Sequence, residues 1–232
     1  MIIVITGASR GIGFAIAKKF AQNNYTIIAC SKNEEVLATA MKNLKAEFPS
    51  IKIHYKASDL SIENNVKDFA AWCLSFGVPD ILVNNAGYFI PGDCINEEDG
   101  SLEKMISINL FSAYWLTRAF INKMIEHETA HIFNMCSVAS LKAYPGGGSY
   151  SVSKFALHGL NQNLRHELKD TGVKVTGVYP GAVFTDSWAG FDNSNGRLME
   201  AKDIADMIYT SANLSKQATV EDIVIRPQKG DL

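Results

Sequence analysis

A tyrosine and a lysine four residues apart, Tyr150 and Lys154, are the pair in this sequence best suited to acid–base chemistry. Apolar residues recur after them with helical spacing, so both side chains would project from one face of a helix. A neighbouring ammonium favours the phenolate, and we therefore expect the pKa of Tyr150 to fall below its usual value of about 10. Such a phenol could donate a proton near neutral pH. The same spacing also occurs by chance on solvated helices, so the pair needs support from the rest of the chain.

A glycine-rich segment near the start of the chain predicts a phosphate site. The apolar run 2–6 is consistent with a buried strand, and Gly7, Gly11 and Gly13 follow it directly. Gly7 and Gly11 permit a tight turn close to a ligand, and Gly13 would let the next helix pack close to the strand. Amides at the helix start, with the helix dipole, then favour a pyrophosphate. The other residues of this turn assigned to the site are Ser9, Arg10 and Ile12.

The tip of the second predicted strand, 26–30, indicates which dinucleotide is bound. In dinucleotide-binding folds this tip meets the adenosine ribose, where an acidic residue favours NAD. Here the tip carries Ser31 and Lys32 instead. Lys32, together with Arg10 of the glycine turn, could neutralise a 2′-phosphate, which predicts NADP(H) as the cofactor. The alternative is that both cations are solvated surface charges.

Polar and small residues also follow later predicted strands, at the edge where ligands bind in open α/β sheets. Asp59 could contact the adenine or cap a turn, and the two roles are equally consistent with the sequence. Ala86 and Gly87 would leave room for the cofactor, while Asn84 and Asn85 could tie neighbouring strands through their amides. The residues assigned to the cofactor at these strand ends are Asp59, Leu60, Asn85, Ala86, Gly87, Pro180, Gly181, Val183 and Thr185.

Two further polar residues could complete an acid–base site. Asn109 lies in an apolar stretch of the helix predicted over 101–127, where an amide needs hydrogen-bond partners. It is either a satisfied core asparagine or part of a relay that holds water. Ser137 follows the strand predicted at 131–135 and precedes Tyr150 by thirteen residues. A Pro-Gly-Gly-Gly run between them could bring strand end and helix start together, although a lone serine at a strand end is usually a turn residue.

Composition and element order define the fold class. The 232 residues carry a formal net charge of −2 and are 47% hydrophobic, an ordinary globular balance. There is no basic excess for nucleic acid and no apolar run long enough to span a bilayer. Strands alternate with helices throughout, which predicts α/β structure: a Rossmann-type, doubly wound parallel sheet of about seven strands with helices on both faces. We expect a single domain over 1–232, with a substrate loop at about 182–200.

The four cysteines show neither C-x-x-C spacing nor a histidine pattern that would form a zinc site. We therefore expect no metal, and we interpret the cysteines as buried free thiols of a cytoplasmic protein.

Together these motifs resemble those of the short-chain dehydrogenase/reductase family over nearly the whole chain. The resemblance rests on the glycine turn 6–13, the run Asn84-Asn85-Ala86-Gly87, the polar residues Asn109, Ser137, Tyr150 and Lys154, and Pro180-Gly181 with Thr185. It implies that NADPH delivers hydride to a carbonyl carbon. Tyr150 would protonate the oxygen, and Ser137 would hydrogen-bond the same oxygen. Lys154 would lower the tyrosine pKa and hold the nicotinamide ribose, and Asn109 would position a water linking Lys154 to solvent.

The resemblance also bears on substrate and assembly. Thr185 and the backbone near Val183 would hold the carboxamide of the cofactor. The chain end lacks the Asp-Gly-Gly common in 3-oxoacyl-carrier-protein reductases and is more similar to bacterial sepiapterin reductase-like enzymes. Trp188 could stack on a flat substrate such as a pterin or simply pack on the domain, and Tyr144 is a second substrate candidate. The helices at 101–127 and 150–169 resemble those that pair subunits in this family, which implies a homodimer or homotetramer.

The expected function is therefore NADPH-dependent reduction of a small-molecule carbonyl. A 3-oxoacyl thioester reductase, acting on acyl carrier protein or CoA substrates, is the alternative within the same chemistry. A non-catalytic NADP(H)-binding regulator is the alternative from another class, and such a protein would be expected to have lost Ser137, Tyr150 or Lys154, all of which are present.

Overall fold

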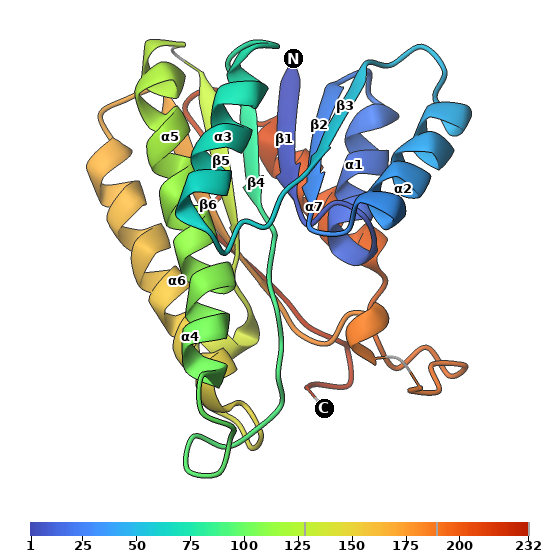
Figure 1. The fold of residues 1–232 in the computed structure, drawn as a ribbon, viewed down its shortest axis with the longest axis vertical. Coiled ribbons are helices and arrows are strands. Elements are labelled where there is room, and N and C mark those ends of the chain that lie inside the picture. Colours follow the sequence, from blue (N-terminus) through green and yellow to red (C-terminus); the bar gives the residue numbers. More distant parts are fainter. Residues whose placement is uncertain (128, 189, 232) are drawn as a thin grey trace.

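Short, mostly apolar runs form the central strands, because residues buried on both faces of a sheet are apolar. The computed structural model describes residues 1–127, 129–188 and 190–231. Its seven strands all pair in parallel, in the order β3-β2-β1-β4-β5-β6-β7 (Figure 1). The strands are β1 Ile2–Thr6, β2 Thr26–Ser31, β3 Ile53–Ala57, β4 Ile81–Asn84, β5 Ala130–Met135, β6 Val173–Pro180 and β7 Asp222–Ile225.

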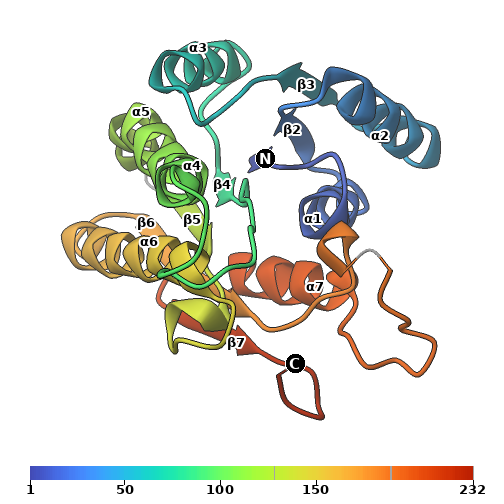
Figure 2. The same cartoon turned by 60° about the horizontal axis from the view of Figure 1, so that its bottom comes forward.

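Helices cover both faces of the sheet, as the alternating pattern predicts (Figures 1 and 2). The α-helices are α1 Gly11–Ala21, α2 Glu34–Glu47, α3 Glu63–Leu74, α4 Ser101–Ile106, α5 Ser112–Glu126, α6 Gly148–Leu168 and α7 Ala201–Ala212. Shorter turns are η1 Ser107–Phe111, which is π-helical, and the 3₁₀ turns η2 Val138–Ser140 and η3 Asp186–Trp188. The Rossmann-type fold prediction is confirmed.

Two apolar cores lie on opposite faces of the sheet. Helices α1, α2 and α7 bury Phe20, Leu37 and Ile204 against one face. Helices α3 and α5 bury Phe69 and Phe120 against the other. Each such side chain contributes about 1.5–3 kcal/mol of transfer free energy, so helix packing on both faces holds the strand ends in fixed positions.

Buried amides link the centre of the sheet to the helices on one face. Asn84 Nδ2 donates to Asn134 Oδ1 at 2.9 Å and to Thr117 Oγ1 at 3.1 Å. Asn134 Nδ2 in turn donates to Asn161 Oδ1 at 2.9 Å. The chain of hydrogen bonds thus joins β4, β5, α5 and α6, which confirms that Asn84 ties neighbouring strands.

The helix predicted over 101–127 is not regular. Its path is continuous, but five residues, Ser107–Phe111, form a π-helical turn between α4 and α5. A π turn adds one residue to the turn and changes which side chains face the neighbouring elements. Asn109 stands in this turn and is 1% exposed.

All strands point the same way, so their carboxyl ends form one edge of the sheet, at the bottom of Figure 1 and facing the viewer in Figure 2. The strand order reverses direction between β1 and β4, which is where open α/β sheets bind ligands. Among the described residues, none of the helices has the length and apolar character needed to cross a membrane.

Candidate active site

The glycine turn between β1 and α1 is held in a shape that side chains would prevent. Gly7 and Gly11 have φ of +65° and +55°, in the left-handed region. A Cβ on Gly13 would lie 2.2 Å from the Gly7 carbonyl oxygen and 2.6 Å from Asn85 Nδ2. Gly13 therefore permits the helix to approach the strand, as predicted.

The start of α1 is open to an anion. Its N-cap residue, Arg10, makes no side-chain cap, and its first turn, which is fully described, carries no acidic residue. The first amides of a helix need partners, and together with the helix dipole they favour a negative group. The turn therefore fits the diphosphate of a dinucleotide.

Thr6 and Asn85 fasten the end of β4 to this turn. Thr6 Oγ1 accepts hydrogen bonds from the amides of Asn85 at 2.9 Å and Ala86 at 2.8 Å. Asn85 Nδ2 donates to the carbonyl oxygens of Thr6 at 2.9 Å and Gly7 at 3.1 Å. The Asn85 side chain thus stabilises the glycine turn, and its role at a cofactor site is to position that turn.

The structure brings Ser137, Tyr150 and Lys154 together at the ends of β5 and α6. Lys154 is 5% exposed, and its Nζ donates to the Met135 carbonyl oxygen at 2.7 Å and lies 5.7 Å from the centre of the Tyr150 ring. Ser137 opens η2, where its Oγ accepts from the Ala139 amide at 3.1 Å, and its side chain hydrogen-bonds Tyr150. A phenol, a hydroxyl and an amine therefore share one small region.

The expected lowering of the Tyr150 pKa is wrong for this structure. Burial raises the pKa of Tyr150 to about 12, and the hydrogen bond from Ser137 opposes this rise only in part. Burial also lowers the pKa of Lys154 to about 8. The physical reason is that both groups are desolvated, and the ammonium points to the Met135 carbonyl and the ring face instead of the phenol oxygen.

Asn109 behaves as a satisfied core asparagine. Its Nδ2 donates to the Tyr88 carbonyl at 3.0 Å and to Ser153 Oγ at 2.8 Å, and its Oδ1 accepts from the Tyr88 amide at 2.7 Å. A Cβ on Gly87 would lie 3.3 Å from Asn109 Oδ1 and 3.6 Å from Lys154 Nζ. Gly87 therefore keeps open a small space next to both polar groups.

Both cations assigned to a 2′-phosphate are paired with carboxylates. Lys32 Nζ lies 2.7 Å from Asp59 Oδ2, and Arg10 Nη1 lies 2.7 Å from Asp186 Oδ2. Next to them, the hydroxyls of Ser9 and Ser31 are 3.0 Å apart. Two cations and two hydroxyls thus stand on the glycine turn and at the β2 tip, and they are called the polar cluster below.

Asp59 combines the turn role with a role in this cluster. Its Oδ1 accepts from the Ser61 amide at 3.1 Å and from Ser61 Oγ at 2.6 Å. Burial acts to raise the Asp59 pKa, but the hydrogen bonds from Lys32 and Ser61 outweigh it and lower the pKa. The same hydrogen bond raises the pKa of Lys32. Asp59 therefore stays charged and holds Lys32 at the β2 tip.

Two predicted cofactor residues can reach a cofactor only through their backbone. The side chain of Leu60 is 3% exposed and lies in the core with α3, and that of Val183 is 4% exposed and packs in the core with α7. Gly181 also packs closely, because a Cβ there would lie 3.0 Å from Pro227 Cδ. Pro180 is the last residue of β6.

The segment predicted as a substrate loop is closed at its base. The amide of Phe184 donates to the Met199 carbonyl at 2.8 Å, and the amide of Met199 donates to the Ala182 carbonyl at 3.1 Å. Thr185 lies against the glycine turn, since a Cβ on Gly11 would be 3.2 Å from Thr185 Cγ2. The loop therefore reaches over the start of α1.

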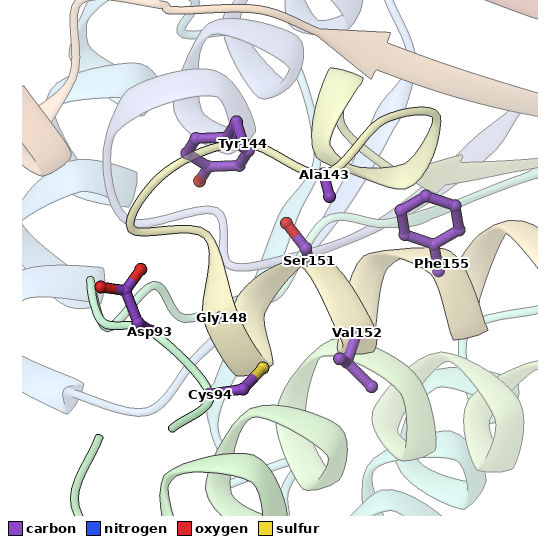
Figure 3. Close-up of a pocket in the computed structure, with 8 residues that line it drawn as sticks. All are labelled: Asp93, Cys94, Ala143, Tyr144, Gly148, Ser151, Val152 and Phe155. Carbon is purple, nitrogen blue, oxygen red and sulfur yellow. The ribbon is translucent and has the colours of Figure 1, made fainter. Parts of the chain in front are cut away.

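The two predicted substrate residues lie on different loops. Trp188 ends η3 and packs edge-on against Phe191, with ring centres 5.4 Å apart. Tyr144 precedes α6 and lines a largely apolar cavity of about 350 Å³ (Figure 3). The complete lining is Asp93, Cys94, Ala143, Tyr144, Gly148, Ser151, Val152 and Phe155. Neither Ser137 nor Tyr150 lines it, so this cavity flanks the acid–base group and is not its reaction site.

The sequence interpretation missed three contributors to this region. Met135 presents its carbonyl oxygen to Lys154, Asp186 pairs with Arg10, and Phe89 packs edge-on against Tyr150 with ring centres 4.9 Å apart. The first acts through its backbone, so no side-chain signal could have revealed it. The acidic residue directly after Thr185 was visible, but its partner 176 positions away was not.

The fold and the site define a dinucleotide-binding oxidoreductase: a glycine turn suited to a diphosphate lies on the same sheet edge as a half-buried tyrosine with a buried lysine and a buried serine. The family model for short chain dehydrogenases matches residues 1–195. The chain belongs to the short-chain dehydrogenase family.

Relatives and solved structures agree with this assignment. An uncharacterized oxidoreductase from Staphylococcus epidermidis is 30% identical over 227 residues, which are 97% of this chain and 96% of the relative. A metagenomic short-chain oxidoreductase in complex with NADP superposes with a TM-score of 0.86 at 30% identity, covering 98% of this chain and 97% of the other. An alcohol dehydrogenase from the archaeon Thermococcus sibiricus, complexed with 5-hydroxy-NADP, gives a TM-score of 0.90 at 26% identity, covering 98% and 96%.

Proposed function

We propose that the protein reduces a small-molecule carbonyl compound to an alcohol with NADPH. The observation that carries this proposal is that Lys154 Nζ lies 5.7 Å from the centre of the Tyr150 ring, with Ser137 close enough to act on the Tyr150 pKa. Bound NADPH supplies the hydride. The solved relatives that hold NADP support the choice of cofactor.

Each residue of the group has a distinct role in the proposal. Tyr150 donates a proton to the carbonyl oxygen, and its high pKa keeps the proton in place at neutral pH. Ser137 hydrogen-bonds the same oxygen and stabilises the charge that develops on it. Lys154, fixed by the Met135 carbonyl, faces the Tyr150 ring and holds the nicotinamide ribose.

Asn109 is a positioning residue in this scheme. It fixes Tyr88 and Ser153, which flank the site on the loop after β4 and on α6. The space that Gly87 leaves next to Asn109 Oδ1 and Lys154 Nζ fits a water, which would link the amine to solvent.

Preference for NADP over NAD rests on the polar cluster at the β2 tip. Arg10 and Lys32 supply two positive charges, and the hydroxyls of Ser9 and Ser31 supply donors for a 2′-phosphate. Arg10 and Lys32 are now paired with Asp186 and Asp59, and both cations are largely exposed to solvent. Ion pairs of exposed side chains contribute little free energy, so a phosphate can replace these carboxylates at low cost.

The substrate is proposed to be compact and flat, in the manner of sepiapterin. The closed base of the 182–200 loop supports a small substrate, and Trp188 offers an aromatic surface next to Thr185. Tyr144, on the turn before α6, lines the neighbouring apolar cavity.

We also propose a homodimer or homotetramer that pairs through the long helices. Large apolar side chains are exposed on them, namely Leu102 on α4, Phe111 on η1, Tyr114 on α5, and Val152 and Phe155 on α6. Helices α4 and α5 follow one another in a line beside α6 (Figures 1 and 2), so these exposed apolar residues lie on adjacent helices. A cytoplasmic location would keep the four cysteines, which are free in the described chain, in the reduced state.

The test is NADPH consumption against sepiapterin, small diketones and acetoacetyl thioesters. We expect reduction of sepiapterin or a diketone, loss of turnover by about a thousandfold in Tyr150→Phe, and nearly unchanged NADPH binding in that variant. The thioesters test the 3-oxoacyl alternative directly. Undiminished reduction by Tyr150→Phe would refute the assignment. Equal efficiency with NADH, or no loss of NADPH preference in Arg10→Ala with Lys32→Ala, would reject the cofactor roles.

A further inference from the structure

Helix α6, which carries Tyr150 and Lys154, is capped by a residue far away in the sequence. Its N-cap residue, Gly147, has no side chain to offer, and the preceding residues are also glycine and proline. Glu97 takes this place from the loop after β4. Its Oε2 accepts from the Ser149 amide at 3.2 Å, and its Oε1 accepts from the Ser149 hydroxyl. Ser149 is 2% exposed, so this carboxylate contact is buried on one side.

The loop and the helix start are shaped to meet. Gly148 has φ of +35°, and a Cβ there would lie 2.4 Å from the Gly92 carbonyl oxygen and 3.0 Å from Glu97 Oε2. The Gly92 amide donates to the Gly146 carbonyl at 3.1 Å, and the Gly146 amide donates to Asp93 Oδ1 at 3.0 Å. Figure 3 shows Asp93 and Cys94 of this loop beside Gly148 at the start of α6.

The same loop also contacts the acid–base group. Tyr88, at its beginning, exchanges hydrogen bonds with Asn109, and Phe89 packs edge-on against the Tyr150 ring. One segment, 88–97, therefore spans from Asn109 past Tyr150 to the first turn of α6. A substitution at Glu97 would therefore alter contacts on both sides of Tyr150, namely those of Ser149 and of Phe89.

We propose that Glu97 is a positioning residue for the proton donor: its carboxylate caps the helix that carries Tyr150 and keeps that phenol in place and protonated. Tyr150 is the third residue of α6, within the turn where the helix dipole favours negative charge. The dipole alone would stabilise a phenolate, whereas Tyr144 and Cys136, the titratable groups that face Tyr150, raise its pKa. The Glu97 carboxylate, bonded to the first turn of α6, would act in the same direction as these two groups. The role of Glu97 rests on the function proposed for Tyr150.

The kinetic test compares Glu97→Gln, Glu97→Ala and the control Glu98→Gln, which removes the charge of the neighbouring, exposed carboxylate. Glu97→Gln retains an acceptor oxygen but no charge, so kcat should stay within a few-fold, while the part of the pH profile that reports ionisation of Tyr150 moves about half a unit lower. Glu97→Ala should lower kcat about tenfold with KM for NADPH unchanged. A Glu97→Gln profile that overlays those of Glu98→Gln and the wild type would overturn the proposal.

A second measurement does not depend on turnover. The ring-carbon NMR signal of Tyr150, identified by its loss in Tyr150→Phe, reports ionisation of the phenol directly. Glu97→Gln should show an ionised fraction about threefold larger than wild type at the same alkaline pH, and Glu98→Gln should not. An unchanged fraction in Glu97→Gln overturns the role of Glu97. Full activity in Tyr150→Phe overturns the proposed function instead, so the two failures are distinguishable.

Discussion

The guanidinium of Arg10 lies 2.7 Å from the carboxylate of Asp186, and this ion pair joins the glycine turn to the loop after β6. The two side chains are 68% and 63% exposed, and pairs of this kind contribute about 0–1 kcal/mol. The pair is therefore easily exchanged. In the proposed complex, Asp186 and the 2′-phosphate compete for the same guanidinium.

Removing this competitor should favour the phosphorylated cofactor. We expect Asp186→Asn to bind NADPH about two- to fivefold more tightly at low salt, with a smaller change for NADH. Calorimetric titration with both cofactors measures the difference. Asp192→Asn changes another exposed acid of the same loop and is the control. Weaker NADPH binding in Asp186→Asn would instead assign the ion pair to closing the loop over the cofactor.

Glycine-to-alanine changes at Gly13 and Gly159 should have opposite effects on stability. A methyl group at Gly13 would meet the Gly7 carbonyl at 2.2 Å, and neither backbone can move without opening the turn. Gly13→Ala should therefore reduce the free energy of unfolding by about 3 kcal/mol and weaken dinucleotide binding. Gly159 lies inside α6, and within the described chain no atom stands within 4 Å of a Cβ there. Gly159→Ala should stabilise the protein by up to about 1 kcal/mol, as urea unfolding would show.

Lys154 should destabilise the fold while it serves the reaction. Its pKa is about 8 in the folded chain and about 10.4 when unfolded, so between these values the unfolded state binds more protons and stability rises with pH. Lys154→Met should unfold at a free energy about 1–3 kcal/mol higher than wild type at pH 7, with this advantage shrinking toward pH 10, and should lose activity. Urea unfolding at several pH values tests this. A difference that is constant with pH would contradict it.

A buried histidine predicts sensitivity to acid. His131 is 4% exposed, its Nε2 lies 2.7 Å from Thr176 Oγ1, and burial lowers its pKa to about 3. Between about pH 6.5 and 3 the unfolded state binds the extra proton, so stability falls as pH drops through this window. Over the same pH interval, the free energy of unfolding of His131→Leu should fall by about 2–4 kcal/mol less than that of the wild type. The exposed His166, replaced in His166→Leu, is the control, and equal slopes for all three proteins would contradict the prediction.

Much of the architecture follows from local signals. The apolar run 2–6 is consistent with a buried strand, and the glycine spacing after it indicates where a diphosphate fits. The positions of Ser137 and Tyr150 relative to a glycine-rich turn predicted that their side chains would meet, and they do. These features are encoded by neighbouring residues, so the chain alone reveals them.

The electrostatics of the site could not be predicted in the same way. In solvent, an adjacent ammonium and phenolate would lower the tyrosine pKa and raise the lysine pKa. Burial has the reverse effect on both groups, and here it is the larger cause. Depth of burial depends on elements from the whole chain. Likewise, Glu97 meets Ser149 across 52 positions, and the only local signal was a helix start that lacked a cap of its own.

The π-helical turn Ser107–Phe111 limits which changes in chain length the site can tolerate. Deleting one residue of this turn would give a regular and intrinsically more stable α-helix. The deletion would also rotate Asn109 by roughly 100° around the helix axis and break its hydrogen bonds to Tyr88 and Ser153. The length of this helix should therefore matter more to the reaction than the identity of its exposed residues.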